Sequence, residues 1–343
     1  MGSFLIDAWL GDELDRAVRV LDEASASELR EEVRRVGRET GLVGTPLEEL
    51  VTAASELAHN QLRHAREGVV LVRAIERRSI PGVELVAADR GPGLIEPRRA
   101  LLGKPNGGEG PGLGVGLSSV LRLSDEVDID VRLRQGSCVR ARKFAARVPR
   151  SREVGIYGIP CAGEATSGDH AAFVRTEHSL LLALADGLGH GPEAYHAAGL
   201  ALDGLRSFVD RSLEQLVDER HEALVGTRGA AVALLRLDEE AGVCEHFGVG
   251  NVAVGLEGFR SSRKLTGRSG IVGGTTISRT RGRLERAELR PHEVVWLASD
   301  GVSSKASIAL ERDLLHDHPI VIAEAVARMH GRDHDDVTVL VAR

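Results

Sequence analysis

Residues 180–191 read LLLALADGLGHG, an apolar run that ends at Asp186 and is followed by a glycine-rich turn. An earlier junction has the same form, because VELVAA at 83–88 runs into DRGPGL at 89–94. A carboxylate that follows a buried strand and precedes glycines lies at a strand end, where loops carry ligand-binding groups. The two junctions therefore predict one functional site in each half of the chain.

The composition predicts a cytoplasmic protein of two domains. A chain of 343 residues is long enough for two, and its formal charge of −7 with a pI near 6.0 argues against a nucleic-acid partner. No apolar stretch approaches the roughly 18 residues of a membrane helix, and the first residues lack the basic region of a secretory signal. The 3 cysteines have no paired spacing, which fits a reducing compartment.

A polar segment with a central proline, ARVPRSREV, predicts a domain boundary near 148–152 and domains at 1–150 and 151–343. In the first domain, TPLE at 45–48 has the pattern of a capping box with proline at the first helical position. Apolar residues at helical spacing follow it. The other expected elements are a helix at 25–40, strands at 68–75 and 83–88, and a hairpin of 127–133 with 137–145.

The second domain has many short strand-like runs and two helical patterns, at 192–208 and 320–330. Many strands with few helices predict stacked sheets covered by helices rather than a regular alternation of strand and helix.

The first site has a glycine-rich stretch, GGEGPGLGVGL at 107–117, which matches neither common phosphate-binding motif. It is either a flexible loop or a lid over phosphates, since glycine lets backbone amides approach an anion. Glu56 and Asn60 are four residues apart and share a helix face. They form either a solvated face or a pair that binds Mg²⁺ and a nucleophile. Asp89, at the end of a strand, could accept from an adenine amino group.

ELVTAASELAHNQLRHA, DRGPGL and GPGLGVGLSSVLRLSDEVDI, in this order, resemble the N, G1 and G2 boxes of the GHKL, or Bergerat, ATP-binding fold. More narrowly, residues 17–145 resemble anti-sigma regulatory serine kinases of the RsbT/RsbW group. The resemblance implies an α/β sandwich in which Glu56 is the general base, Asn60 binds Mg²⁺ and Asp89 recognises adenine. It also implies that a set of glycines shapes the ATP pocket and lid, namely Gly91, Gly93, Gly112, Gly114 and Gly116.

The second site rests on acids that each adjoin an apolar strand-like run, namely Asp169, Asp186, Asp300, Asp335 and Asp336. Each alone reads as a turn-former or cap. Together, without paired Cys or His, they predict a site for Mg²⁺ or Mn²⁺, since hard cations prefer oxygen ligands. Two such ions about 3.5–4 Å apart can activate water and bind a phosphate.

PCAGEATSGD, ALADGLGHGPEA, GTRGAAVALLRLD, WLASDG and DDVTVLVA resemble PPM-type serine/threonine phosphatases of the SpoIIE/RsbX branch over residues 154–343. The resemblance implies an α-β-β-α sandwich with two Mn²⁺ or Mg²⁺ ions. Asp186 would bridge them and Gly187 would contribute its carbonyl. The remaining ligands would be Asp169, Asp300 and one of the pair Asp335 and Asp336, with the choice left open.

Two polar side chains near these acids have open roles. His190 either donates a proton to the leaving serine oxygen or only supports the turn. Arg228 either reaches toward phosphate or extends into solvent from a strand edge.

The two resemblances imply an α+β protein of two domains that acts as a bacterial partner-switching regulator. It would phosphorylate and dephosphorylate a serine on a STAS-domain antagonist, using ATP, and so control a sigma factor or similar output. The alternative is a metal-dependent phosphatase whose first domain binds nucleotide and a partner, such as a sigma factor, without kinase activity.

Overall fold

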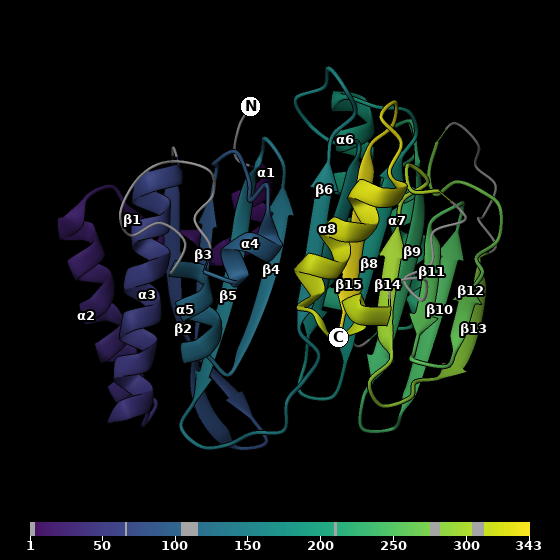
Figure 1. Cartoon of the computed structure of the whole chain (residues 1–343). Helices are drawn as coiled ribbons and strands as arrows, with labels where there is room; N and C mark the ends of the chain where they lie inside the picture. The colour runs from purple at the N-terminus through teal and green to yellow at the C-terminus, as the bar shows by residue number, and fades with distance from the viewer. Residues whose placement is uncertain (1–3, 66, 104–115, 209–210, 275–281, 304–311) are drawn as a thin grey trace. The chain divides into compact units, whose positions relative to one another are not determined.

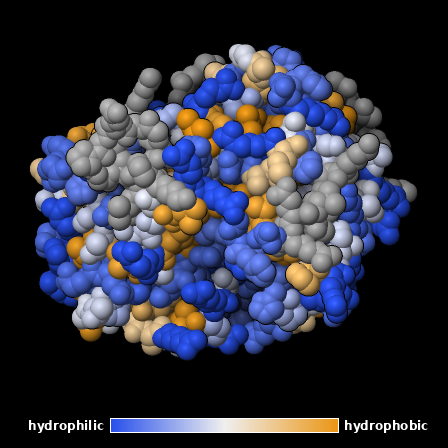
Figure 2. Space-filling model, in the orientation of Figure 1, coloured by the Kyte–Doolittle hydropathy of each residue, from blue (hydrophilic) through white to orange (hydrophobic). Residues whose placement is uncertain are grey.

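The computed structural model describes residues 4–343 except 66, 104–115, 209–210, 275–281 and 304–311. The chain divides into two compact units, Met1–Val154 and Gly155–Arg343, each with its own core. No helix in the described part of the chain is both long and apolar enough to cross a membrane. Hydrophilic residues cover most of the face drawn in Figure 2, and apolar residues appear there in small groups.

The first unit is an antiparallel sheet with helices on both faces. Its strands lie in the order β1-β2-β3-β5-β4. Their bounds are β1 Val18–Val20, β2 Gly68–Arg77, β3 Ile80–Asp89, β4 Glu126–Arg132 and β5 Gly136–Phe144. The helices are α1 Phe4–Leu10, a 3-10 turn at Gly11–Arg16, α2 Glu23–Glu39, α3 Thr45–His64, α4 Pro97–Leu101 and α5 Gly116–Leu123.

The helices of this unit are divided between the faces of the sheet. α2 and α3 pack on one face (Figure 1), and α1 packs on the other, where Ile6 and Trp9 join Leu71 and Val86 in one buried cluster. The Trp9 indole N–H donates to Asp130 Oδ2 at 2.8 Å, which fixes α1 against β4. The expected α/β sandwich is confirmed, although the short helix α1 was not predicted.

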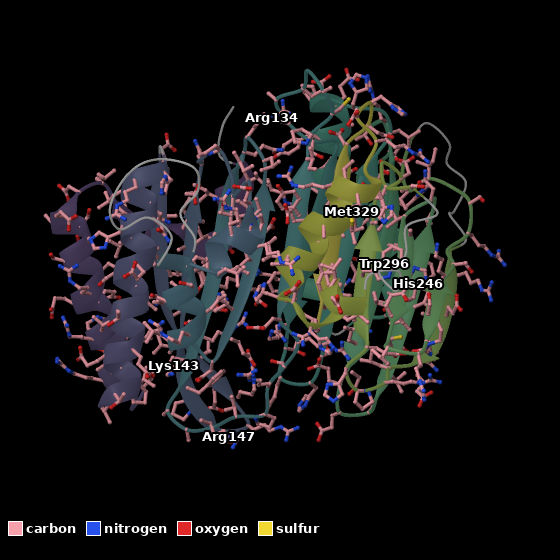
Figure 3. The ribbon with its side chains drawn as sticks, in the orientation of Figure 1. Arg134, Lys143, Arg147, His246, Trp296 and Met329 are labelled. Carbon is pink, nitrogen blue, oxygen red and sulfur yellow. The ribbon has the colours of Figure 1, made fainter. Side chains whose placement is uncertain are left out.

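The beginning of α3 differs from the sequence prediction. Gly44, with a φ of 66°, is the residue that precedes the helix, no side chain caps it, and Thr45 is already helical. The predicted capping box is therefore wrong, and Pro46 is the second helical residue rather than the first. Further along the helix, Glu49 Oε2 lies 2.6 Å from the Nζ of Lys143 on β5 (Figure 3), which ties α3 to the sheet.

The second unit contains two facing antiparallel sheets. One has the order β13-β10-β9-β8-β7, and the other includes β6-β15-β14-β11-β12. The strand bounds are β6 Val154–Ile159, β7 Asp169–Arg175, β8 Leu180–Gly187, β9 Ala230–Asp238, β10 Val243–Val249, β11 Ala253–Glu257, β12 Ser262–Leu265, β13 Arg283–Glu288, β14 Val294–Ala298 and β15 Val337–Ala342. The helices are α6 Pro192–Leu202, α7 Leu213–Ala223 and α8 Pro319–His330, with 3-10 turns at Leu205–Phe208 and Arg312–His316.

Helices cover the outer faces of both sheets, so this unit has four layers. α6 and α7 pack on the sheet that contains β8 and β9, and α8 packs on β15 of the other sheet (Figure 1). The expected α-β-β-α sandwich is confirmed. The helix predicted at 192–208 ends at Leu202, and α7 was not predicted.

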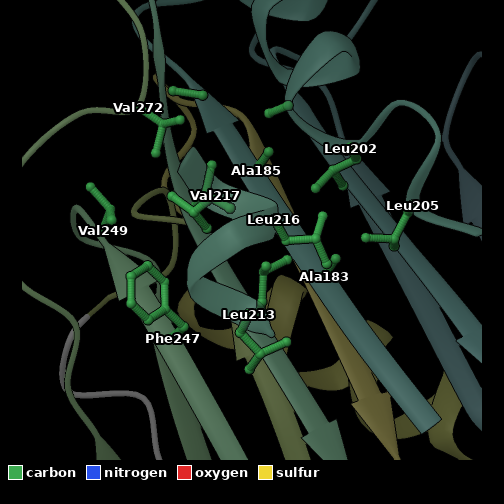
Figure 4. Close-up of a cluster of buried hydrophobic side chains, with 14 of the residues drawn as sticks. Ala183, Ala185, Leu202, Leu205, Leu213, Leu216, Val217, Phe247, Val249 and Val272 are labelled. Carbon is green, nitrogen blue, oxygen red and sulfur yellow. The ribbon is translucent and has the colours of Figure 1, made fainter. Parts of the chain in front are cut away.

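The layer between α6, α7 and the β8 sheet is a continuous apolar core (Figure 4). Side chains alternate along a strand, so every second residue of β8 faces these helices: Leu181, Ala183 and Ala185. Leu213, Leu216 and Val217 supply the facing stripe of α7. This packing fixes the direction of β8 and therefore the position of Asp186 at its end.

Candidate nucleotide and metal sites

In the first unit, Glu56 and Asn60 lie half-buried on α3, facing the N-terminal end of α5. A Cβ on Gly116, the first residue of α5, would stand 2.9 Å from Asn60 Oδ1 and 3.2 Å from Glu56 Oε2. Only a glycine leaves both polar groups unobstructed at that point. The pair is thus half-buried beside the first residue of α5.

Asp89 is the last residue of β3 and is mostly buried. Its Oδ1 accepts the backbone N–H of Gly91 at 2.6 Å, which turns the chain directly after the strand. Burial raises the pKa of Asp89 to about 6, and the hydrogen bonds from Gly91 and Ser137 oppose that rise. The Asp89 carboxylate is therefore held at the end of β3 by backbone N–H groups.

Two further features shape this site. Gly93 has a φ of 82°, a conformation that glycine adopts without strain. Gln61, a residue that was not predicted to have a role, donates through Nε2 to the carbonyls of Val69 and Ala88 at 3.0 and 3.1 Å. Gln61 thus joins α3 to β2 and β3 beside Asp89. Gly112 and Gly114 lie outside the described residues.

In the second unit, the acids come from strand ends at one end of the two sheets. Asp169 begins β7 and is paired in register with Asp186, near the end of β8. Asp300 follows β14 and Asp335 precedes β15, which pairs antiparallel with β14. The start of one antiparallel strand lies beside the end of its neighbour, so the fold brings acids from distant segments together.

Hydrogen bonds connect the two sheets at this end. The backbone N–H of Asp300 donates to Asp186 Oδ2 at 3.3 Å. Asn251, which the sequence analysis did not assign a role, donates through Nδ2 to Asp300 Oδ2 at 2.6 Å. Its signal in the sequence is its place at the end of FGVGN, residues 247–251, between β10 and β11.

The carboxylates disfavour one another's charge. Burial, and then the charge of Asp186, raises the pKa of Asp169 well above its ordinary value. Burial and the charge of Asp300 raise the pKa of Asp186 to about 7, and the same two causes raise the pKa of Asp335. Among the described residues, the buried Asp169 Oδ2 has no hydrogen-bond partner.

These acids meet in pairs. Within the described ranges, no three side chains of His, Cys, Asp or Glu are grouped closely enough to hold one ion as they stand. A shared cation therefore requires the side chains to turn toward a common point.

Asp336 is placed differently from its neighbour Asp335. It is 3% exposed, and its two carboxylate oxygens each accept a backbone N–H at 2.7 Å, Oδ1 from Cys161 and Oδ2 from Gly168. Gly168 in turn accepts the N–H of Gly187 at 3.1 Å. Asp336 thus holds the segment before β7 and, through it, the turn that follows Asp186.

The turn after Asp186 requires glycine because α6 packs directly on it. A Cβ on Gly187 would stand 2.2 Å from the carbonyl oxygen of Ala194 on α6. His190 is exposed beyond this turn, and its Nδ1 lies 2.8 Å from Glu164 Oε1. Glu164 was not singled out from the sequence, since 26 residues separate it from His190.

Comparisons with known proteins agree with this division of the chain. Residues 20–143 match the model of the histidine kinase-like ATPase domain, and residues 176–343 match that of Stage II sporulation protein E (SpoIIE). The serine/threonine-protein kinase RsbT of Bacillus subtilis (strain 168) is 30% identical over 127 residues, which are 37% of this chain and 94% of RsbT.

The phosphoserine phosphatase RsbX of the same organism is 26% identical over 97 residues, which are 28% of this chain and 49% of RsbX. The match thus spans about half of that relative. A solved chain from work on the bacterial stressosome, described as a modular system adapted to control secondary messenger signaling, is 30% identical with a TM-score of 0.52. The likeness covers 57% of this chain and 100% of that chain.

Proposed function

Because the chain belongs to the histidine kinase-like ATPase family and its residues 176–343 match the SpoIIE model, we propose that it is a metal-dependent protein serine phosphatase joined to an ATP-dependent serine kinase. Both activities act on the same phosphoprotein, so the chain sets how much of that partner is phosphorylated. The likeness to a named serine/threonine-protein kinase and to a named phosphoserine phosphatase supports this pairing.

The phosphatase proposal rests on one observation, the convergence of Asp169, Asp186, Asp300 and Asp335 at one end of the β-sandwich. Buried carboxylates that raise one another's pKa need either protons or cations. An oxygen-only set with an unpartnered, buried Asp169 Oδ2 suits Mg²⁺ or Mn²⁺. Hydrolysis of p-nitrophenyl phosphate with Mn²⁺, and its loss in chelator, tests the proposal.

The residues that would hold two such ions are Asp169, Asp186, Asp300 and Asp335, with the carbonyl of Gly187. When bound, the ions would supply an activated water and neutralise the phosphate. His190 is exposed beside this end of the sandwich, and Glu164 fixes its Nδ1. That leaves Nε2 to donate a proton to the serine oxygen as the phosphorus–oxygen bond breaks.

Of the last two acids, we assign Asp335 to the metal site and Asp336 to the support of the backbone. Both oxygens of Asp336 already accept backbone N–H groups, whereas Asp335 and Asp300 interact through their charges. The two carboxylates therefore have separate roles.

Asp336→Ala is expected to lower the free energy of unfolding by about 2–5 kcal/mol, because two buried N–H groups lose a charged acceptor. Asp335→Ala is expected to lower it far less, since it removes one of several mutually repelling carboxylates, and still to abolish metal-dependent hydrolysis. Urea denaturation of both variants without metal measures the difference. Equal destabilisation, or a larger loss for Asp335→Ala, contradicts the assignment.

In the first unit, the arrangement of Glu56, Asn60 and Asp89 supports ATP binding. Asn60 Oδ1 faces the N-terminal end of α5 and would bind Mg²⁺. The Asp89 carboxylate would accept from the adenine amino group. Glu56 would take the proton from a substrate serine. The serine oxygen would then bond to the γ-phosphorus of ATP while the bond between that phosphorus and the β–γ bridging oxygen breaks.

Full-length protein is expected to bind ATP more tightly with Mg²⁺ than without it. Asn60→Ala should remove most of that difference, whereas Asp89→Asn should weaken binding whether or not Mg²⁺ is present, because an amide cannot replace the carboxylate as acceptor in the same orientation. Titration calorimetry measures both. Thr52→Ala, an exposed change on the same helix, is the control. Equal effects of Mg²⁺ in wild type and Asn60→Ala contradict the role of Asn60.

The same assay gives a pH test of Asp89. With its pKa raised to about 6 by burial, the carboxyl is protonated below that pH and loses the charge that makes it a strong acceptor for the adenine amino group. ATP affinity should therefore fall as the pH drops through about 6, and Asp89→Asn should remove this part of the pH dependence.

The partner that we propose is a STAS-domain antagonist whose serine is phosphorylated, with a sigma factor or similar regulator downstream. The likeness to RsbT, RsbX and a stressosome chain supports this class of partner. A second candidate keeps the phosphatase and makes the first unit a nucleotide-binding module without kinase activity. The steady-state phosphorylation of the partner separates the two.

A further inference from the structure

Arg228 lies over the turn that follows Asp186. Its Nη1 is 2.9 Å from the position that a Cβ on Gly189 would occupy, and its Nη2 is 2.5 Å from Glu193 Oε2 at the start of α6. The side chain is 47% exposed. The guanidinium therefore lies beside the turn that follows Asp186 and pairs with Glu193.

Hydrogen bonds fix the segment that carries Arg228 to the same turn. The N–H of Leu188 donates to the carbonyl of Gly229 at 3.1 Å. Thr227 Oγ1 accepts the N–H of Gly229 at 3.0 Å and donates to the carbonyl of Leu224 at 2.7 Å. The backbone on both sides of Arg228 is thus held, so the guanidinium stays beside the turn.

Three exposed apolar side chains surround this segment. Leu188, Val225 and Ile271 are 39%, 51% and 41% exposed. A Cβ on Gly229 would stand 2.5 Å from Ile271 Cγ2, and Val225 forms a β-bridge with Gly274. Single exposed apolar residues are ordinary. Here three of them adjoin one exposed arginine at the edge of an acidic site. We call Leu188, Val225 and Ile271 the apolar rim.

We propose that Arg228 binds the phosphate of a phosphoserine and that the apolar rim binds apolar residues next to that serine in an extended segment of the partner protein. This inference rests on the proposed phosphatase function and names its substrate class. A guanidinium binds a phosphate through paired, charge-assisted hydrogen bonds. Glu193, an exposed carboxylate, is a weaker partner that the phosphate displaces.

The rim and the arginine have separable effects. Arg228 contacts the phosphate, so its loss affects every phosphate ester. The rim contacts only residues that flank the serine, so its loss affects peptides and not a small aryl ester. Substrate preference should therefore depend on Val225 and Ile271, while the affinity for any phosphate depends on Arg228.

The test uses full-length protein with Mn²⁺ and three substrates: p-nitrophenyl phosphate, a phosphoserine peptide with leucine and valine beside the serine, and the same peptide with serine and glycine there. Arg228→Gln is expected to raise KM for all three substrates roughly tenfold or more, as for a lost charge-assisted hydrogen bond. Arg228→Lys, which keeps the positive charge, should raise KM less. Arg286→Gln, which removes an exposed arginine paired with Glu245 on another strand, is the matched control.

Ile271→Ser and Val225→Ser are expected to raise KM for the apolar-flanked peptide roughly three- to tenfold relative to p-nitrophenyl phosphate, and to erase its advantage over the polar-flanked peptide. Phe259→Ser, at a 61% exposed apolar residue elsewhere, is the control. If the variants are active and their KM values equal those of the wild type, the proposed contacts of Arg228 and the apolar rim with the substrate are wrong. The phosphatase proposal is unaffected by that result. Wild-type protein that hydrolyses none of the three substrates overturns the phosphatase proposal and this inference with it.

Discussion

Asp186→Asn is expected to reduce the metal-dependent hydrolysis of phosphate esters by more than about a hundredfold, because changes to the outer partners of metal ligands already cost ten- to a hundredfold. Asp186 is opposite Asp169 on β7 and accepts from the backbone of Asp300. An amide at this point has one oxygen to offer and no charge, so it cannot bridge two cations. The measurement is the initial rate with p-nitrophenyl phosphate over a range of Mn²⁺ concentrations.

The pH dependence of metal binding provides a second readout. Burial and the charge of Asp300 raise the pKa of Asp186 to about 7, so below that pH a proton competes with the metal ion. Apparent Mn²⁺ affinity should rise with pH through about 7 in the wild type and rise less in Asp186→Asn. Asp218→Asn, an exposed change on α7, is the control. Full activity in Asp186→Asn, or hydrolysis that chelator does not affect, contradicts the metal assignment.

The fold was largely predictable because its periodic signals are local. α2 and the strands of the first unit follow apolar spacing that neighbouring residues carry. The sequence also held a readable signal for α7 that was not used: Ser212 and Gln215 form a capping box, and Leu213, Leu216 and Val217 form a helical stripe. TPLE at 45–48 had the same kind of signal, but its prediction of a capping box was wrong, because Gly44 and not Thr45 is the residue that precedes the helix.

The roles of adjacent acids could not be predicted in the same way. Asp335 and Asp336 are neighbours with identical side chains, and only tertiary structure brings Cys161 and Gly168, 175 and 168 residues away, to the oxygens of Asp336. The pairing of His190 with Glu164 and of Arg228 with Glu193 likewise depends on loops that meet in space. Sequence patterns can nominate such residues, but which atoms they meet is set by the sandwich.

Substitutions in the two units are expected to drive the phosphorylation of a STAS-domain partner in opposite directions. With ATP and Mg²⁺ present, wild-type protein should leave the partner's serine partly phosphorylated. Asp300→Asn should bring it close to full phosphorylation, because hydrolysis is lost while the replacing amide keeps an oxygen to which Asn251 can donate. Glu56→Ala should leave the serine bare, because no group then accepts the hydroxyl proton. Mass spectrometry of the partner measures all three states.

This result decides between the two functions proposed for the first unit. A nucleotide-binding module without kinase activity would still bind ATP through Asn60 and Asp89, so binding data alone cannot separate it from a kinase. Phosphate that accumulates on the partner in Asp300→Asn beyond the wild-type level requires phosphoryl transfer from ATP, and its loss on adding Glu56→Ala assigns that transfer to α3. If a bound partner stays unphosphorylated in Asp300→Asn, the kinase proposal fails and the nucleotide-binding module replaces it. The phosphatase proposal would then stand on the Asp186→Asn result, because the two sites share no residue.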